Sequence, residues 1–317
     1  AGDAAEKGII KNQALTYFVA LTRRFLVGVG VDDKRLRFRQ HLGDEMAHYA
    51  SDCWDAEIEL SMGWTEAVGI ADRGSYDLEQ HMKHSGADLR AFERFDQPVE
   101  TERDALVPVA AKLGPLFKKR AAEVKGALST AEKSAIQPDG SAKLNVGGET
   151  IQVPADCFEL KRVKEKVHGR RFVPHVIEPS YGLDRIVYSV MEHAFFEKDD
   201  YTVLRLKPKV APVKFGVFPL MARDGLDGEA RKLDAALRER GMATCYDDGG
   251  SIGRRYARMD EIGTPFCITF DYDLLQDRAV TVRDRDSQKQ ARVPIDALAR
   301  VAAELLERGS DALQGWK

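Results

Sequence analysis

The C-terminal third of the chain alternates strand-like and helix-like segments, and this alternation constrains the fold more than any other feature. Runs of apolar residues predict strands at 214–220, 243–247, 265–271 and 279–285. Helical spacing predicts a helix that Gly241 caps, a second over about 253–262 that Gly263 caps, and a final helix from Ile295. Strands and helices of this length imply a mixed sheet covered by helices.

The best domain boundary lies just before this alternating region. Pro208 and Pro212 interrupt a segment that has little helical pattern. A chain of 317 residues is long enough for two domains of ordinary size. We therefore expect one domain over residues 1–207 and a second over 208–317.

The first domain opens with an amphipathic helix and two strands. Gly28 and Gly30 act as stop signals for the helix. The strands are expected at 35–40 and 64–70, and the second reads as mostly buried. Five residues repeat at helical spacing and predict the face that the helix buries: Ala14, Tyr17, Phe18, Leu21 and Phe25.

Residues from about 84 to 165 are typical of an insertion. The stretch 85–132 is rich in charge and reads as helical, with the basic run 118–120 and Glu123 on a solvated face. Alternation over 143–153 around Gly147 and Gly148 predicts a β-hairpin that closes the insertion.

Composition excludes several classes of protein. The formal net charge is −3, so a nucleic-acid surface must be a local patch. The four cysteines form no C-x-x-C pair, which argues against a zinc knuckle or a disulfide framework and favours a reducing compartment. No segment approaches the roughly 20 apolar residues of a membrane helix, so we expect a soluble intracellular protein with no membrane partner.

Residues 178–185, Glu-Pro-Ser-Tyr-Gly-Leu-Asp-Arg, are the richest in functional groups. We expect a strand to end at Val176–Ile177 and a helix to run from Ile186. Backbone N–H groups at a helix start, with an arginine in the first turn, favour an anion such as phosphate. Glu178 and Ser180 are suited to hold a cationic group beside that anion. A lone Gly-x-x-Arg carries little information by itself.

A second segment, Gly-Trp-Thr-Glu-Ala-Val-Gly-Ile-Ala-Asp-Arg at 63–73, makes the match specific. Together the two segments resemble the late catalytic core of class II aminoacyl-tRNA synthetases, in the homodimeric glycyl-tRNA synthetase family. Four further segments resemble the same family: residues 37–41, 45–50, 52–55 and 214–292. The resemblance covers nearly the whole chain and is weakest over about 84–161. It implies an α/β (α+β) fold, with part of an antiparallel-sheet catalytic core followed by an α/β anticodon-binding domain.

The resemblance implies roles for the residues of both segments. Glu66, Ala67, Gly182 and Arg185 would bind ATP, and Glu66 would act through Mg²⁺. On a regular strand Glu66 shares a face with Trp64 and Val68, which is unusual for a solvated acid. Alternatively, Glu66 is simply a solvent-facing residue. Arg185 could likewise form a surface ion pair with Asp184 or Glu192.

Glycine itself would be bound by Glu178, Pro179 and Ser180. Trp64, Arg73 and Tyr181 would support the pocket, although large aromatic residues are more often plain core and Arg73 is equally suited to a structural ion pair. A cluster of His41, His48 and Tyr49 is assigned to structural support, because the reaction needs no obligatory general base.

In the second domain a glycine-rich turn at 247–253 enters a helix that carries Arg254 and Arg258. It lacks the Gly-Lys-Ser/Thr ending of a P-loop and the Gly-x-Gly-x-x-Gly of a dinucleotide fold. The charged strand 281–290 is either a solvated edge or a reader of anticodon bases. The resemblance favours RNA, with Arg283, Arg285 and Gln288 as candidates beside the two helix arginines.

The resemblance thus implies ATP-dependent ligation of glycine to tRNA(Gly) through a glycyl-adenylate, with a homodimer as the full-length form. It implies a cytoplasmic protein and leaves a mitochondrial form open. The first two class II motifs are not found, so we expect a C-terminal fragment that is inactive alone. The alternative is a non-catalytic tRNA-binding or polymerase-accessory protein derived from a synthetase.

Overall fold

The computed structural model describes residues 2–10, 12–198 and 201–316. The chain forms two compact units. One contains the residues up to Asp77 and those from His175 onward, and the other is Leu78–Pro174. The second unit is several residues longer at each end than the expected insertion.

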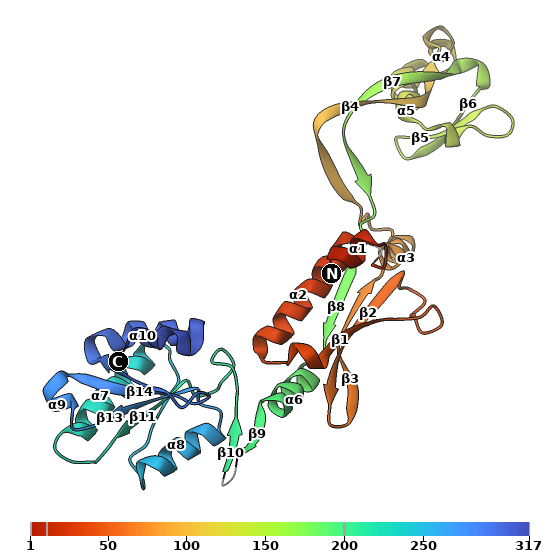
Figure 1. Cartoon of the computed structure of the whole chain (residues 1–317). Helices are drawn as coiled ribbons and strands as arrows, with labels where there is room; N and C mark the ends of the chain where they lie inside the picture. The colour runs from red at the N-terminus through yellow and green to blue at the C-terminus, as the bar shows by residue number, and fades with distance from the viewer. Residues whose placement is uncertain (1, 11, 199–200, 317) are drawn as a thin grey trace. The chain divides into compact units, whose positions relative to one another are not determined.

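A four-stranded antiparallel sheet forms the centre of the N-terminal part of the first unit (Figure 1). Its strands, in the order β1-β2-β3-β8, are Leu36–Gln40, Asp52–Leu60, Gly63–Asp72 and Ile177–Tyr181. β1 and β3 confirm the predicted strands. β2 was not predicted, although its alternating apolar residues give a clear signal. β8 begins where the strand was expected to end, so Glu178 and Ser180 lie within the strand itself.

Two helices pack against this sheet and share its core, α2 (Gln13–Val29) and α6 (Leu183–Ala194). The helix α2 ends at Gly30 as expected, but its predicted buried face is wrong. The buried stripe is Leu15, Val19, Thr22 and Leu26, whereas Tyr17 stays 61% exposed. The two stripes are neighbours with the same period, so spacing alone does not distinguish them.

Shorter elements complete the N-terminal part of the first unit. They are α1 (Gly2–Glu6), η1 (Asp33–Arg35), the helix α3 (Tyr76–Ser85), whose later residues fall in the second unit, β9 (Phe195–Lys198) and β10 (Tyr201–Leu204). β9 and β10 form an antiparallel pair.

The second unit contradicts one expectation. Ala91–Pro108 is the long strand β4, which pairs with β7 (Phe158–Phe172) in an antiparallel two-stranded ribbon. The sequence of β4 is rich in charge and was expected to be helical. It forms a strand because opposite charges pair across the ribbon, as Arg103 and Glu165 do at 2.5 Å. The predicted hairpin is confirmed as β5 (Ala142–Val146) and β6 (Glu149–Val153), joined at Gly147 and Gly148, both with positive φ. The remaining elements are α4 (Ala110–Phe117), η2 (Lys118–Arg120), α5 (Ala121–Thr130), η3 (Lys133–Ala135) and η4 (Ala155–Cys157).

The C-terminal part of the first unit is the predicted mixed sheet. The order is β12-β11-β13-β14-β15, parallel among the first three strands and antiparallel beyond. The strands are Thr244–Tyr246, Phe215–Pro219, Phe266–Phe270, Ala279–Asp284 and Gln290–Pro294, and the last was not predicted. The helices are α7 (Leu226–Glu239), α8 (Ile252–Glu261), α9 (Leu274–Asp277) and α10 (Ile295–Arg308), followed by η5 (Gly309–Leu313).

Both faces of this mixed sheet are covered. The helices α7 and α10 share the large core with alternate strand residues such as Val217 and Ile268. Phe218 and Cys267 point to the opposite face, where they meet Met259 of α8. None of the helices in the described parts of the chain has the length and apolar character needed to cross a membrane.

Candidate active site

One face of the four-stranded sheet is covered by helices, and the other carries most of the predicted site. Trp54, Ala56 and Ile58 of β2 belong to the core that α2 and α6 share. Alternation therefore turns Asp55 and Glu57 to the opposite face, which we call the open face. The register aligns Asp55 with Gly69 and Gly69 with Ser180, and it aligns Ala71 with Glu178. Gly69 thus lies between Asp55 and Ser180, and Ala71 lies between Cys53 and Glu178.

A β-bulge decides the position of Glu66. Ala56 pairs with Val68 but Glu57 pairs with Glu66, so Ala67 is an extra residue in β3. The expectation that Glu66 shares the face of Val68 is therefore wrong. Val68 is buried in the helix-side core, whereas the Glu66 carboxylate is half exposed on the open face. A methyl group built on Gly69 would lie 3.6 Å from Glu66 Oε1 and 3.7 Å from Asp55 Oδ1, so both acids face this glycine.

The residues predicted to bind ATP come together although they are more than 100 positions apart. Arg185 donates to the backbone oxygen of Glu66 at 2.8 Å, and its guanidinium lies 3.5 Å from the Glu66 carboxylate. The Gly182 N–H donates to the Ala67 oxygen at 2.8 Å. Arg185 is paired with neither Asp184 nor Glu192. Gly182 is also the N-cap of α6, and no side chain caps this helix start.

Arg73 connects the two segments at the other side of the open face. It donates to Glu178 and to Asp77, at 2.5 and 2.6 Å. The two carboxylates, Asp77 first, raise the pKa of the Arg73 guanidinium above its usual value. Its guanidinium also stacks 4.0 Å from the centre of the Tyr49 ring. His48 packs edge-on against Tyr49 and Tyr76, so these two members of the expected cluster support the arginine that holds Glu178. His41, the third member, interacts instead with Asp55 at 2.6 Å.

Charged side chains that the sequence analysis missed lie on β1 and β2. Arg37 and Arg39 both donate to Glu57, at 2.6 and 3.1 Å. Glu45 raises the pKa of Arg39 more than Glu57 does. Trp64 lies beneath Arg37, with the guanidinium 4.1 Å above its ring. The strict alternation of acidic and apolar residues over 54–60 was the signal that could have found them.

Tyr181 is not on the open face. Its hydroxyl lies 2.9 Å from the Thr22 hydroxyl of α2, and its ring meets Phe25 edge-on. It pairs with Val68, whose side chain is on the helix side. We therefore remove Tyr181 from the pocket walls. Pro179 likewise pairs with Ile70 of the buried core, so it does not face the open side with Glu178 and Ser180, and we remove it from the predicted glycine contacts.

The second candidate surface surrounds the glycine-rich turn before α8. Arg254 is exposed on the first turn of this helix. Arg258 is also exposed, and it clasps the turn by donating to Asp247 and to the Gly249 oxygen. The exposed Gln288 has φ 59°, and its N–H donates to the Asp284 oxygen at 2.9 Å. These three side chains remain candidates for RNA contact.

Two predicted RNA contacts are buried instead. Arg283 is 6% exposed and makes a two-pronged ion pair with Asp260 of α8, both bonds at 2.9 Å. Arg285 is 4% exposed and donates to the oxygens of Gly263 and Leu206. The charged strand hides its arginines because α8 and the 204–206 segment cover that face. We therefore drop both residues from the RNA surface.

Comparison with known proteins finds matches to both the N-terminal and the C-terminal part of the chain. Residues 210–305 match the family model described as an anticodon binding domain. Over 313 residues the chain is 48% identical to a glycine–tRNA ligase of Archaeoglobus fulgidus, covering 98% of this chain and 55% of that protein. Ligases with the same name from Methanocaldococcus jannaschii and Methanothrix thermoacetophila are each 46% identical over 96% of this chain and 54% of theirs.

Together these matches place the chain among the aminoacyl-tRNA synthetases as a class of related proteins. Within that class the chain belongs to the glycyl-tRNA synthetase family, and it spans about half the length of the curated relatives it matches.

Proposed function

We propose that this chain supplies the glycine pocket, part of the ATP site and the anticodon-binding domain of a glycine–tRNA ligase. In this proposal residues 1–207 belong to the catalytic domain and 208–317 bind the anticodon. The observation that carries it is the meeting of Glu66, Arg185, Glu178 and Ser180 on one open face, from segments far apart in sequence.

Glycine would be held by its ammonium group. The carboxylate of Glu178 and the hydroxyl of Ser180 come from one face of β8, opposite Ala71 and Gly69. Arg73 fixes the direction of Glu178 through a 2.5 Å bond. A floor of glycine and alanine leaves room for an ammonium group, and specificity for glycine follows from the lack of space for a side chain.

ATP would lie toward the start of α6. Arg185 and the uncapped N–H groups of the first turn favour phosphate oxygens. Mg²⁺ prefers oxygen ligands, and the half-exposed Glu66 carboxylate fits that preference. When bound, the ion would neutralise charge on the phosphates, and Arg185 would exchange its contact with Glu66 for one with ATP.

The reaction follows from holding the two substrates together. A carboxylate oxygen of glycine attacks the α-phosphorus of ATP, the bond to the β-phosphate oxygen breaks, and pyrophosphate leaves. A ribose hydroxyl of the tRNA end then attacks the glycyl carbonyl, and AMP leaves. The chain's residues position reactants and balance charge, and no side chain is required to transfer a proton.

The C-terminal domain would bind tRNA(Gly) around the turn before α8, through Arg254, Arg258 and Gln288. Two of these are exposed cations, so affinity should fall with salt. We propose a cytoplasmic protein that works as a homodimer in its full-length form.

The test is glycine-dependent exchange of pyrophosphate into ATP. It is measured for this chain and for a version extended upstream in its own reading frame. Exchange by the extended form alone supports the proposal, because the chain spans about half of its relatives. No exchange by either form, with tRNA binding intact, would instead indicate a non-catalytic tRNA-binding protein.

A further inference from the structure

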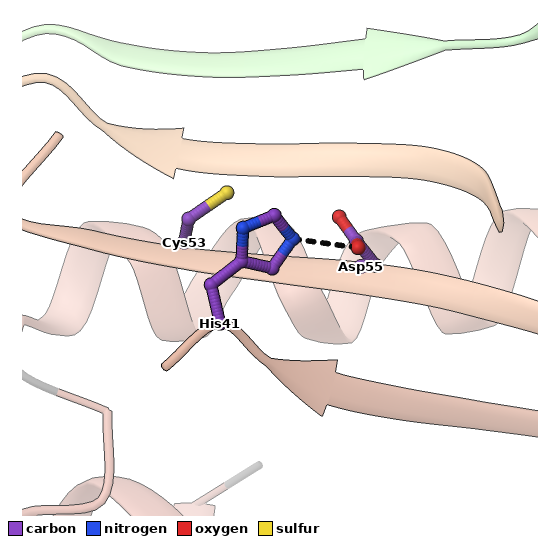
Figure 2. A group of neighbouring side chains, drawn as sticks. All are labelled: His41, Cys53 and Asp55. Atoms are coloured by element: carbon purple, nitrogen blue, oxygen red, sulfur yellow. Dashed lines mark hydrogen bonds and ion pairs between the residues drawn. The ribbon is translucent and has the colours of Figure 1, made fainter. Parts of the chain in front are cut away.

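Three different metal-binding side chains meet at the end of β1, and nothing in the proposed reaction uses them. His41 follows β1 directly, and Cys53 and Asp55 lie two residues apart on β2. The backbone N–H of His41 donates to the backbone oxygen of Cys53 at 2.9 Å. This bond places His41 opposite the two β2 residues. Figure 2 shows the imidazole between the thiol and the carboxylate. One donor atom from each residue lies within 4.8 Å of the other two.

We propose that His41, Cys53 and Asp55 bind a thiophilic divalent metal ion such as Zn²⁺. One imidazole nitrogen, one thiolate and one carboxylate oxygen form a ligand set typical of zinc. Mg²⁺ favours oxygen ligands only, so this site is distinct from the ATP-bound ion at Glu66. The proposal does not depend on the glycine–tRNA ligase reaction.

The individual donors are suited to this role. Asp55 is 5% exposed, and its Oδ2 lies 2.6 Å from His41 Nε2. Its Oδ1 makes no hydrogen bond with any residue that the structure describes. The metal ion would replace this direct contact between the histidine and the carboxylate. Arg39 approaches Asp55 only to 3.7 Å, because Glu45 and Glu57 hold its guanidinium.

The charge around Cys53 favours a cation. Burial, followed by the charges of Asp55, Asp52 and Glu66, raises the pKa of the Cys53 thiol to about 11. The same negative potential attracts a divalent ion, and the ion then stabilises the thiolate. Three protein ligands leave a fourth position for water, as in open zinc sites.

The test is titration of the metal-free wild-type protein with Co²⁺, which reports thiolate ligation by a charge-transfer absorption band. We expect about one Co²⁺ per chain with this band, and displacement by Zn²⁺ without the band. Cys53→Ser should abolish the band, and His41→Gln should weaken binding about tenfold or more. Cys245→Ser is the matched control, since Cys245 is also half-buried but lies in the C-terminal sheet.

The wild-type result decides the proposal even where a variant misfolds. Absence of a thiolate band in correctly folded wild-type protein at saturating Co²⁺ would overturn it. So would a band that survives Cys53→Ser and disappears in Cys245→Ser. Circular dichroism of each variant establishes whether it is folded.

Discussion

The two large sheets of the first unit differ in whether their charged residues are buried or exposed. In the C-terminal sheet both faces are covered, and Arg283 meets Asp260 in a closed, buried pair. In the β1-β2-β3-β8 sheet one face is left open, and Glu66, Glu178 and Arg185 keep exposed fractions of about half. Charged groups at the open face thus remain accessible, whereas the strand arginines of the covered sheet make internal contacts.

The largest expected effect comes from breaking the closed pair. Asp260→Ala would leave a buried guanidinium without its partner, and the free energy of unfolding of the C-terminal domain should fall by about 3–5 kcal/mol. Urea denaturation followed by circular dichroism measures it. The double variant Asp260→Leu with Arg283→Met should recover most of the loss. A loss under about 1 kcal/mol in the single variant would contradict the comparison.

The matching change on the open face should affect binding and leave stability nearly unchanged. Glu178→Gln removes the charge proposed to hold the glycine ammonium. A hydrogen bond to a charged group contributes about 1.5–3 kcal/mol, so the KM for glycine should rise roughly 10- to 100-fold. Pyrophosphate exchange by the extended protein measures it. Glu159→Gln, an exposed ion-paired acid of the second unit, is the control and should have no effect.

Gly182 tests how tightly the two segments meet. A Cβ at this position would lie 3.1 Å from the Ala67 oxygen, closer than ordinary contact. Gly182→Ala should therefore displace the bulge and reduce exchange activity. The free-energy cost of such overpacking is about 1–3 kcal/mol. Gly253→Ala is the control, because nothing lies near its added methyl group. Equal activity in the two variants would show that the contact can relax.

The smallest expected effect concerns RNA. Arg254→Ala should reduce the slope of log affinity against log salt by about 1, since one phosphate contact is lost. Filter binding of tRNA at several salt concentrations measures it. Arg300→Ala serves for comparison, because that exposed arginine on α10 is paired with Glu304. If both variants lower the slope equally, the RNA surface lies elsewhere.

Sequence reasoning succeeded where one periodic signal was strong. The C-terminal strands and helices were predicted because burial on both faces gives long apolar runs and regular helical spacing. The helix α2 was found, but its face was not, since Leu15 and Tyr17 both belong to apolar stripes. The strand β4 was mistaken for helix because its charges are neutralised by β7, about 60 residues away.

The candidate site was predicted only in part. The family pattern identified Glu66, Arg185 and Glu178, which the structure brings to one face. Asp55 and Glu57 were missed because β2 itself was missed. Arg283 and Arg285 were misassigned because an alternating charged strand does not reveal which helix covers it.

The extra residue at Ala67 determines to which face of the sheet each residue of β3 points. On either side of it, even-numbered positions of β3 change from the open face to the core. Moving the bulge by one residue, from Ala67 to Glu66, would take Glu66 out of its place opposite Glu57 and leave the pairing of Val68 unchanged. The face to which a residue of β3 points is therefore found by counting from the bulge.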